Sequence, residues 1–184
     1  MPRKARLVVF FGLVATGKTC LAQAFARRIG ARHHNSDEVR KELAGLAPTA
    51  RAQEELGAGI YSPELSRRTY RELLVRAEAD LAAGQPVVLD AAYKTRAERQ
   101  TVRELGQRLG VPARFVFCTC PEAEVQRRLA LRAQDPEAVS DGRWEIHLAQ
   151  RRSFEEPAAE EDDVLVLDTA HPLPELLARL DAAG

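Results

Sequence analysis

Residues Gly12-Leu-Val-Ala-Thr-Gly-Lys-Thr19 follow the apolar run Leu7-Val-Val-Phe-Phe11 and decide the fold of this chain. They match G-x-x-x-x-G-K-[ST], in which glycines permit a tight turn and backbone N–H groups face phosphate oxygens. In this motif Lys18 reaches the β- and γ-phosphates, and the Thr19 hydroxyl ligates Mg²⁺. A helix beginning at about Gly17 adds the positive end of its dipole. The motif therefore predicts a nucleotide site formed by Gly12, Leu13, Val14, Ala15, Thr16, Gly17, Lys18, Thr19 and Cys20.

Apolar runs elsewhere in the chain predict the rest of a sheet. The five predicted strands are Leu7–Phe11, Arg32–Asn35, Pro86–Asp90, Ala113–Cys118 and Val164–Leu167. Most of these runs are continuous rather than alternating, as expected for strands buried on both faces of a parallel sheet. Helical patterns separate them, which predicts an α/β fold with a five-stranded parallel sheet and helices on both faces.

Composition and charge narrow the class of protein. With 184 residues, 45% hydrophobic and 29% charged, the sequence predicts one domain spanning residues 1–184. A net charge of zero provides no global field to attract nucleic acid or anionic membrane. No apolar run is long enough to span a membrane. Cys20, Cys118 and Cys120 show no disulfide or metal-ligand spacing, which favours reduced thiols in the cytoplasm.

Two irregular segments interrupt the alternation of strands and helices. Residues 44–62 contain several glycines and a proline, and a connection of this length is typical of a substrate-binding segment. Residues 133–143 contain Asp135-Pro136 and Asp141-Gly142, which predict a connection that acts as a lid. The acidic run Glu160-Glu-Asp-Asp163 is expected to be solvated surface.

Asp37 and Arg40 follow the second predicted strand directly. Ligands of doubly wound sheets bind at the carboxyl ends of strands. The two residues are three apart at a helix start, opened by Ser36 or Asp37, so they share a face and can contact one substrate. Asp37 can accept the proton of an attacking hydroxyl as general base, and Arg40 can bind an anionic group of the acceptor. The alternatives are that Asp37 caps its helix and that Arg40 is solvated.

Asp90 ends the third predicted strand in Val87-Val-Leu-Asp90. A carboxylate at this position either holds Mg²⁺ together with Thr19 or contacts the acceptor. The alternative is that Asp90 caps the turn that follows the strand.

Arg128 and Arg132 lie four residues apart on a predicted helix before the lid, so they share one face. Arginines carried by a lid stabilise charge on a transferring phosphoryl group. The alternative is that both are ordinary surface residues in an arginine-rich chain.

Taken together, these residues resemble the P-loop kinase family that includes polynucleotide 5′-hydroxyl kinases, zeta-toxin-like kinases and small bacterial kinase domains. The resemblance rests on Gly12–Thr19, Ser36-Asp37-x-x-Arg40, Val87–Asp90 and Arg128-x-x-x-Arg132. It implies the nucleotide-kinase fold with a lid. It also implies that Asp37 is the general base, that Arg40 binds an acceptor phosphate, and that Arg128 and Arg132 engage the donor phosphates.

The sequence thus favours an ATP-dependent phosphotransferase that uses Mg²⁺ and acts on a hydroxyl group of a small molecule. We expect a monomer or a weak dimer with no membrane partner. Zero net charge and few aromatic residues make a polynucleotide 5′-hydroxyl acceptor the second choice. A non-catalytic module that switches a partner on nucleotide binding is the alternative of another class.

Overall fold

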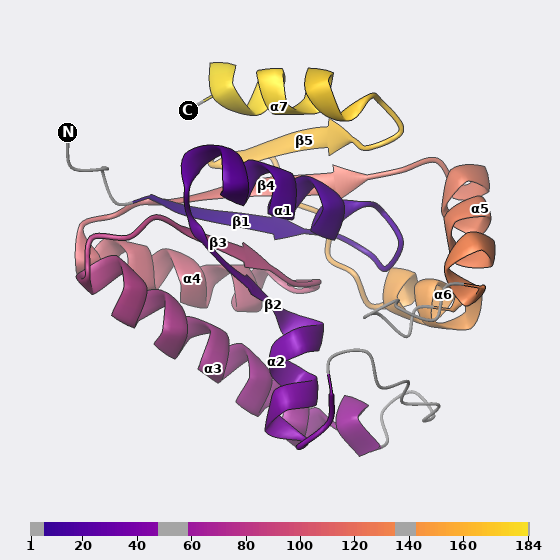
Figure 1. Cartoon of the computed structure of the whole chain (residues 1–184), viewed down its shortest axis with the longest axis horizontal. Helices are drawn as coiled ribbons and strands as arrows, with labels where there is room; N and C mark the ends of the chain where they lie inside the picture. The colour runs from indigo at the N-terminus through magenta and orange to yellow at the C-terminus, as the bar shows by residue number, and fades with distance from the viewer. Residues whose placement is uncertain (1–5, 48–58, 135–142, 184) are drawn as a thin grey trace.

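The computed structural model describes residues 6–47, 59–134 and 143–183. Its centre is a five-stranded sheet with the order β2-β3-β1-β4-β5, in which every neighbouring pair is parallel (Figure 1). The strands are β1 (Leu7–Phe11), β2 (Arg32–Asn35), β3 (Val87–Asp90), β4 (Ala113–Thr119) and β5 (Val164–Asp168). The predicted α/β fold and its five strands are confirmed, with shifts of one residue at some ends.

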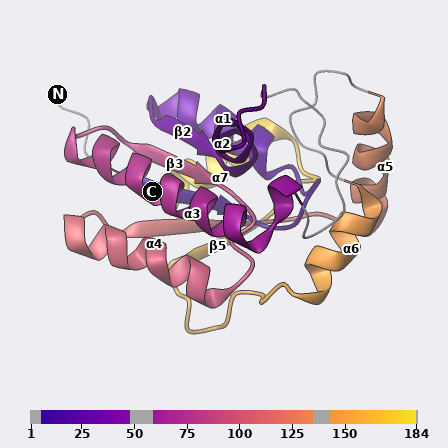
Figure 2. The same ribbon diagram turned by 90° about the horizontal axis from the view of Figure 1, so that it is seen from below.

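The helices cover both faces of this sheet. They are α1 (Lys18–Ile29), α2 (Ser36–Leu43), α3 (Pro63–Ala82), α4 (Arg96–Leu109), α5 (Glu122–Ala133), α6 (Trp144–Arg152) and α7 (Leu173–Ala182), with a short 3₁₀ helix η1 (Gly59–Tyr61). Figure 1 shows α1 and α7 on one face, and Figure 2 shows α3 and α4 side by side on the other. Helices α5 and α6 lie beyond the carboxyl ends of the strands.

Alternation along β1 explains the two layers. Leu7, Val9 and Phe11 pack with α2, α3 and α4, whereas Val8 and Phe10 pack with α1 and α7. All five side chains are buried, so β1 is apolar on both faces, as a central parallel strand must be. This burial explains why the run that precedes the phosphate-binding loop is continuous rather than alternating.

Local signals in the sequence account for where these helices begin and end. Gly30 ends α1 in the left-handed conformation, with φ of 64°, which glycine adopts at little cost. The Ser62 hydroxyl caps α3, with Pro63 in the first turn. Thr95 and Glu98 form a reciprocal capping box at the start of α4. At its other end, α4 stops at Gly110, which has φ of 66°.

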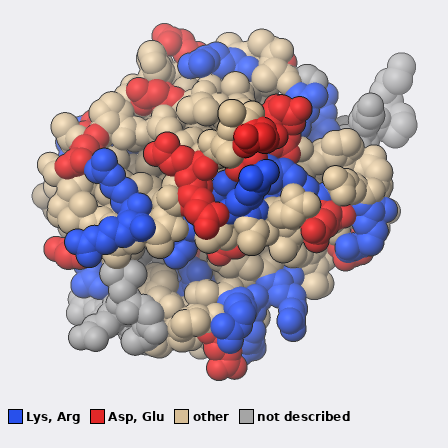
Figure 3. Space-filling model, turned by 180° about the vertical axis from the view of Figure 1, so that it is seen from behind, with Lys and Arg blue, Asp and Glu red and all other residues tan. Residues whose placement is uncertain are grey.

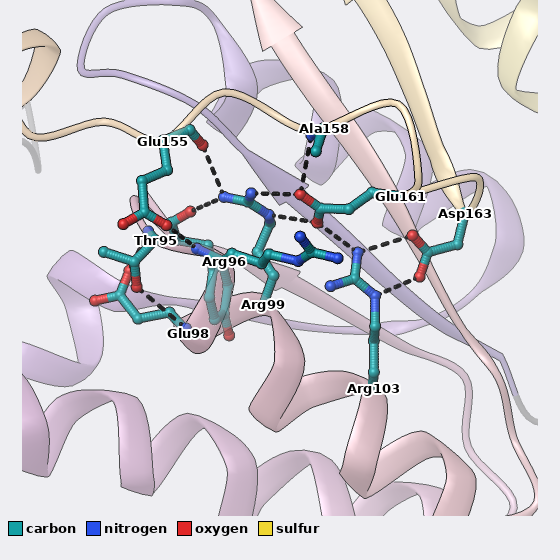
Figure 4. A network of polar contacts seen from close by, with 10 residues as sticks. Thr95, Arg96, Glu98, Arg99, Arg103, Glu155, Ala158, Glu161 and Asp163 are labelled. Carbon is teal, nitrogen blue, oxygen red and sulfur yellow. Dashed lines mark hydrogen bonds and ion pairs between the residues drawn. The ribbon is translucent and has the colours of Figure 1, made fainter.

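The predicted surface role of the acidic run 160–163 holds for Glu160 and Asp162, which are exposed, but is wrong for Glu161 and Asp163. Glu161 has a side chain only 3% exposed, and it accepts hydrogen bonds from Arg99 at 2.7 and 2.9 Å. Arg103 joins Glu161 to Asp163, as Figure 4 shows. The run lies against α4 because two arginines of that helix point into the segment before β5. Ion pairing across 60 residues has no periodic signal in the sequence.

Parts of the two predicted irregular segments lie outside the described residues. Residues 48–58 belong to the predicted substrate-binding segment and residues 135–142 to the predicted lid. Among the described residues, no helix has the length and apolar character that crossing a membrane requires.

Candidate active site

Loops from β1 and β3 leave the sheet toward opposite faces. The loop after β1 leads to α1 on one face, and the loop after β3 leads to α4 on the other. Because the two strands are neighbours, their carboxyl ends flank a crevice of the kind in which α/β sheets bind ligands.

The phosphate-binding loop occupies this crevice. Gly12 and Gly17 have φ of 142° and 80°, backbone conformations that side chains with a Cβ rarely adopt. The Gly12 N–H donates to the Ala92 carbonyl at 3.3 Å, which ties the loop to the β3–α4 connection. Within the loop, the Leu13 carbonyl accepts from the Thr16 hydroxyl at 2.8 Å and from Lys18 Nζ at 3.4 Å. The Leu13 carbonyl therefore connects the loop to Lys18 at the start of α1.

Gly17 is also required by its surroundings. A Cβ at this position would lie 2.7 Å from Arg128 Nη1 and 3.0 Å from Thr169 Oγ1. The Thr169 hydroxyl in turn bonds the Thr16 carbonyl. The second glycine of the motif is thus where α5 and the β5–α7 connection approach the loop.

Asn35 links the elements that carry the predicted metal ligands. Its Nδ2 donates to Asp90 Oδ2 at 2.6 Å and lies 3.5 Å from the Thr19 hydroxyl. Its Oδ1 accepts from the backbone N–H groups of Asp37 and Glu38, so Asn35 is the N-cap of α2. The prediction that Ser36 or Asp37 caps this helix is wrong, because the asparagine that ends β2 already satisfies those donors.

Asp90 is fully buried between the loop and β2. Burial alone would raise the pKa of this carboxyl group, but the nearby His33 ring and the Lys18 ammonium outweigh burial and hold the pKa below its ordinary value. Oδ1 of Asp90 has no hydrogen-bond partner among the described residues. An ionised carboxylate with an unsatisfied oxygen next to a threonine hydroxyl fits a hard cation such as Mg²⁺.

Asp37 and Arg40 lie on the first turns of α2 and pair with each other. Arg40 Nη1 donates to Asp37 Oδ1 at 2.9 Å. The Arg40 guanidinium lies 5.1 Å from the centre of the Tyr61 ring, and its Nε is buried without a hydrogen-bond partner among the described residues. The side chain of Asp37 is 27% exposed and that of Arg40 is 9% exposed. This burial excludes the alternative that Arg40 is a solvated surface residue.

A pair of tyrosines underlies the β3–α4 connection. The Tyr93 N–H donates to the Tyr70 hydroxyl at 3.3 Å, and the two rings meet edge to face. Tyr93 has φ of 40° and is 1% exposed. Its hydroxyl has no hydrogen-bond partner among the described residues, and burial raises its pKa well above the ordinary value. Strained backbone with a buried unpaired hydroxyl is a feature of functional sites.

Arg128 and Arg132 line a pocket of about 360 Å³ next to the phosphate-binding loop. Its other walls come from the start of α1, including Cys20, and from the β5–α7 connection. Each guanidinium nitrogen of Arg128 is engaged: Nε donates to Glu124, and Nη1 and Nη2 donate to the hydroxyl and carbonyl of Thr169. This places Arg128 in the pocket wall, and an interaction with the γ-phosphate would require it to exchange these partners.

The structure thus gathers most of the predicted site residues at one edge of the sheet. Thr19 and Asp90 contact Asn35, and Asp37 lies on the helix that Asn35 caps. The Lys18 ammonium acts on Asp90, whose pKa it helps to lower. Arg128 and Arg132 instead lie on the side of the loop where the pocket opens. Asn35 was missed because an asparagine at a strand end resembles an ordinary turn residue.

Comparison with protein families identifies the broader group. The family model described as AAA domain (AAA_33) matches residues 7–157. The "Uncharacterized protein Rv2004c" of Mycobacterium tuberculosis and the "Uncharacterized protein Mb2027c" of Mycobacterium bovis are 31% identical over 100 residues, which is 54% of this chain. The match covers 20% of the length of each of those proteins.

Solved structures agree in fold. A sugar kinase from Janibacter sp. HTCC2649, in an unliganded structure, has a TM-score of 0.72 at 20% identity and covers 97% of this chain and 93% of its own. The APS kinase of Mycobacterium tuberculosis, in complex with AMPPNP and APS, has a TM-score of 0.70 at 20% identity, with 98% of both chains covered. A gluconokinase from Sinorhizobium meliloti 1021 has a TM-score of 0.66 at 20% identity, covering 98% of this chain and 96% of its own. The chain therefore belongs to the AAA_33 family and has the fold of the P-loop kinases.

Proposed function

We propose that this protein is an ATP-dependent kinase that transfers the γ-phosphate of Mg·ATP to a hydroxyl group of a small molecule. One observation carries the proposal. Asn35 caps the helix that presents Asp37, and the same side chain bonds Asp90 and lies beside Thr19. The side chain of Asn35 thus connects the helix that carries Asp37 to the end of the phosphate-binding loop. This connection supports Asp37 as the proton acceptor that phosphoryl transfer requires.

The donor half of the site has room for a nucleoside. The pocket beside Gly17 combines apolar walls, such as Leu131 and Leu173, with the guanidinium groups of Arg128 and Arg132. An apolar slot with a few polar groups at its rim is typical of small-molecule sites. We place the base and ribose of ATP there, with the phosphates running along the loop toward Lys18.

Asp37 would accept the proton of the acceptor hydroxyl as that oxygen attacks the γ-phosphorus. Lys18 would neutralise charge on the phosphoryl oxygens, with Arg128 and Arg132 contributing if the donor phosphates draw them from their present partners. Thr19 and Asp90 would hold Mg²⁺, which supplies Lewis-acid stabilisation of the triphosphate when bound. The alternative role for Asp90 is a direct contact with the acceptor.

Arg40 supports an acceptor that carries an anionic group. Its guanidinium is buried, with Nε unsatisfied among the described residues, and an anion would complete its hydrogen bonds. Such an anion would also compete with Asp37 for Arg40, so acceptor binding would release the carboxylate for proton abstraction.

A small acceptor fits the charge distribution better than a polynucleotide. On the face shown in Figure 3, acidic and basic side chains lie side by side, in keeping with a net charge of zero. Polynucleotide binding relies on clustered basic residues and weakens steeply with salt. The non-catalytic alternative loses one of its supports, because Asn35 rather than Asp37 caps α2.

The test is a transfer screen with γ-labelled ATP and Mg²⁺ against two sets of acceptors: phosphorylated or carboxylated small molecules with a hydroxyl group, and 5′-hydroxyl oligonucleotides. We expect label on at least one small acceptor. Transfer only to oligonucleotides would favour a polynucleotide 5′-hydroxyl kinase. ATP binding without transfer to any hydroxyl compound would favour the non-catalytic module that switches a partner on nucleotide binding.

A further inference from the structure

Helix α6 holds one residue of the phosphate-binding loop from two sides. Gln150 Oε1 accepts from the Val14 N–H at 2.8 Å, and His147 Nδ1 lies 3.0 Å from the Val14 carbonyl. Because a carbonyl can only accept, the ring must carry its proton on Nδ1. Both backbone groups of Val14 are thus satisfied by side chains that lie more than 130 residues away in the sequence.

These contacts orient the two peptide groups that flank Val14. In a trans peptide, the C=O and the following N–H point in opposite directions. Binding the Val14 N–H to Gln150 therefore turns the Leu13 carbonyl away from α6, and it is this carbonyl that accepts from Thr16 and Lys18. Binding the Val14 carbonyl to His147 likewise turns the Ala15 N–H away from α6.

Ala15 shows that the loop needs such support. It has φ of 64°, the left-handed conformation that costs a residue with a Cβ about 1–2 kcal/mol. Conformations of this kind persist only where the surroundings hold them in place. The methyl group of Ala15 is buried against Val125 and Leu129 of α5, with Trp144 packed beside them. Trp144 also stacks on the His147 ring, with centroids 5.2 Å apart.

The segment after α6 reaches the other side of the crevice. The Glu155 N–H donates to the Lys94 carbonyl at 2.8 Å, and the Glu155 carboxylate accepts from the Arg96 N–H at 2.7 Å. Arg99 Nη1 donates to the carbonyls of Tyr93 and Glu155 (Figure 4). The chain from Trp144 to Glu155 therefore contacts both the phosphate-binding loop and the β3–α4 connection.

We propose that His147 and Gln150 are positioning residues that arrange the phosphate-binding loop before the nucleotide arrives. The loop then binds the β- and γ-phosphates without first ordering its backbone, which would otherwise reduce the affinity. The inference rests on the proposed function in one respect, namely that the loop binds ATP. It requires neither Asp37 as base nor a particular acceptor.

The experiment compares the dissociation constants of Mg·ATP and adenosine for the intact chain and four variants. Gln150→Met keeps the length of the side chain but removes the oxygen that accepts from Val14. Loss of this partly buried hydrogen bond on the loop predicts about a tenfold weaker affinity for ATP. Adenosine has no phosphates for the loop to bind, so its affinity stays within about twofold. Arg152→Ala, an exposed position on the same helix, is the matched control and leaves both affinities unchanged.

A second pair of variants guards against loss of folding in Gln150→Met. His147→Asn can place an amide N–H where Nδ1 donates, whereas His147→Ala cannot. We expect ATP affinity to fall in the alanine variant and to be largely recovered in the asparagine variant. Equal losses of ATP affinity and adenosine affinity would overturn the inference. It would also be overturned if neither Gln150→Met nor His147→Ala weakened ATP binding. Absence of ATP binding by the unchanged chain would instead overturn the proposed function, and this inference with it.

Discussion

Replacing Glu161 with glutamine should destabilise this protein far more than the position of the residue in an acidic run suggests. Glu161 accepts from Arg99 through both carboxylate oxygens and from Arg103 through one of them. The side chain of Arg99 is fully buried, and its guanidinium lies 5.2 Å from the centre of the Phe11 ring. Glutamine has nearly the same shape but no charge, so it leaves the buried guanidinium without its counter-ion.

Two independent estimates give the size of the effect. Hydrogen bonds from Arg99 lower the pKa of Glu161 from 4.5 to about 2, against the opposing effect of burial. A difference of this size corresponds to about 3 kcal/mol of stabilisation by the ionised form. Removing one partner of a buried ion pair costs about 3–5 kcal/mol in other proteins. For a chain of this length, 3 kcal/mol lowers the melting temperature by about 6–12 °C.

The assay is urea or thermal unfolding of the wild type, Glu161→Gln and the control Glu160→Gln, whose side chain is exposed. A control within about 0.5 kcal/mol of the wild type is expected. The folded-state pKa of Glu161 lies below its unfolded value, so its contribution is complete above pH 4.5 and is lost as the pH falls through about 2. The gap between wild type and Glu161→Gln should therefore narrow over that interval. Equal stability of the two glutamine variants at pH 7 would refute the reasoning.

Three further substitutions probe the site itself. Asn35→Ala removes the cap of α2 and the link between Thr19 and Asp90, so unfolding experiments should show a loss of about 1–2 kcal/mol, and calorimetry should show a weaker effect of Mg²⁺ on ATP affinity. Gly17→Ala places a Cβ 2.7 Å from Arg128 Nη1 on a backbone with φ of 80°, so equilibrium titration should detect no specific ATP binding in a chain that still folds. Tyr93→Phe removes a buried hydroxyl that lacks a partner among the described residues, so the melting temperature should stay the same or rise; a clear fall would show that the hydroxyl is satisfied in solution.

The architecture was predictable because it rests on local and periodic signals. Continuous apolar runs such as Leu7–Phe11 predicted buried parallel strands. Helix ends carry local signals of the same kind, such as the caps Ser62 and Gly30. The phosphate-binding motif and the carboxylate of Asp90 were found because they lie at strand ends, where α/β proteins bind ligands.

The features that were not predicted depend on contacts between distant parts of the chain. In the sequence Glu161 resembles a surface residue, and only the fold brings Arg99 and Arg103 against it. No local pattern distinguishes these two arginines from the exposed arginines of α4. Gln150 and His147 acquire a role only because α6 packs on the phosphate-binding loop. Long-range pairing of polar groups leaves no spacing pattern, since it is set by how the helices dock.

The central claim is that Asp37 and the phosphate-binding loop form the two halves of one kinase site. The most direct test measures, in parallel, ATP affinity and the rate of label transfer to the best acceptor of the screen for the wild type and Asp37→Asn. Asparagine keeps the shape of the side chain but cannot accept the proton, so the transfer rate should fall by at least about 10²-fold while the dissociation constant of Mg·ATP stays within about twofold. Transfer at the wild-type rate by Asp37→Asn would contradict the claim.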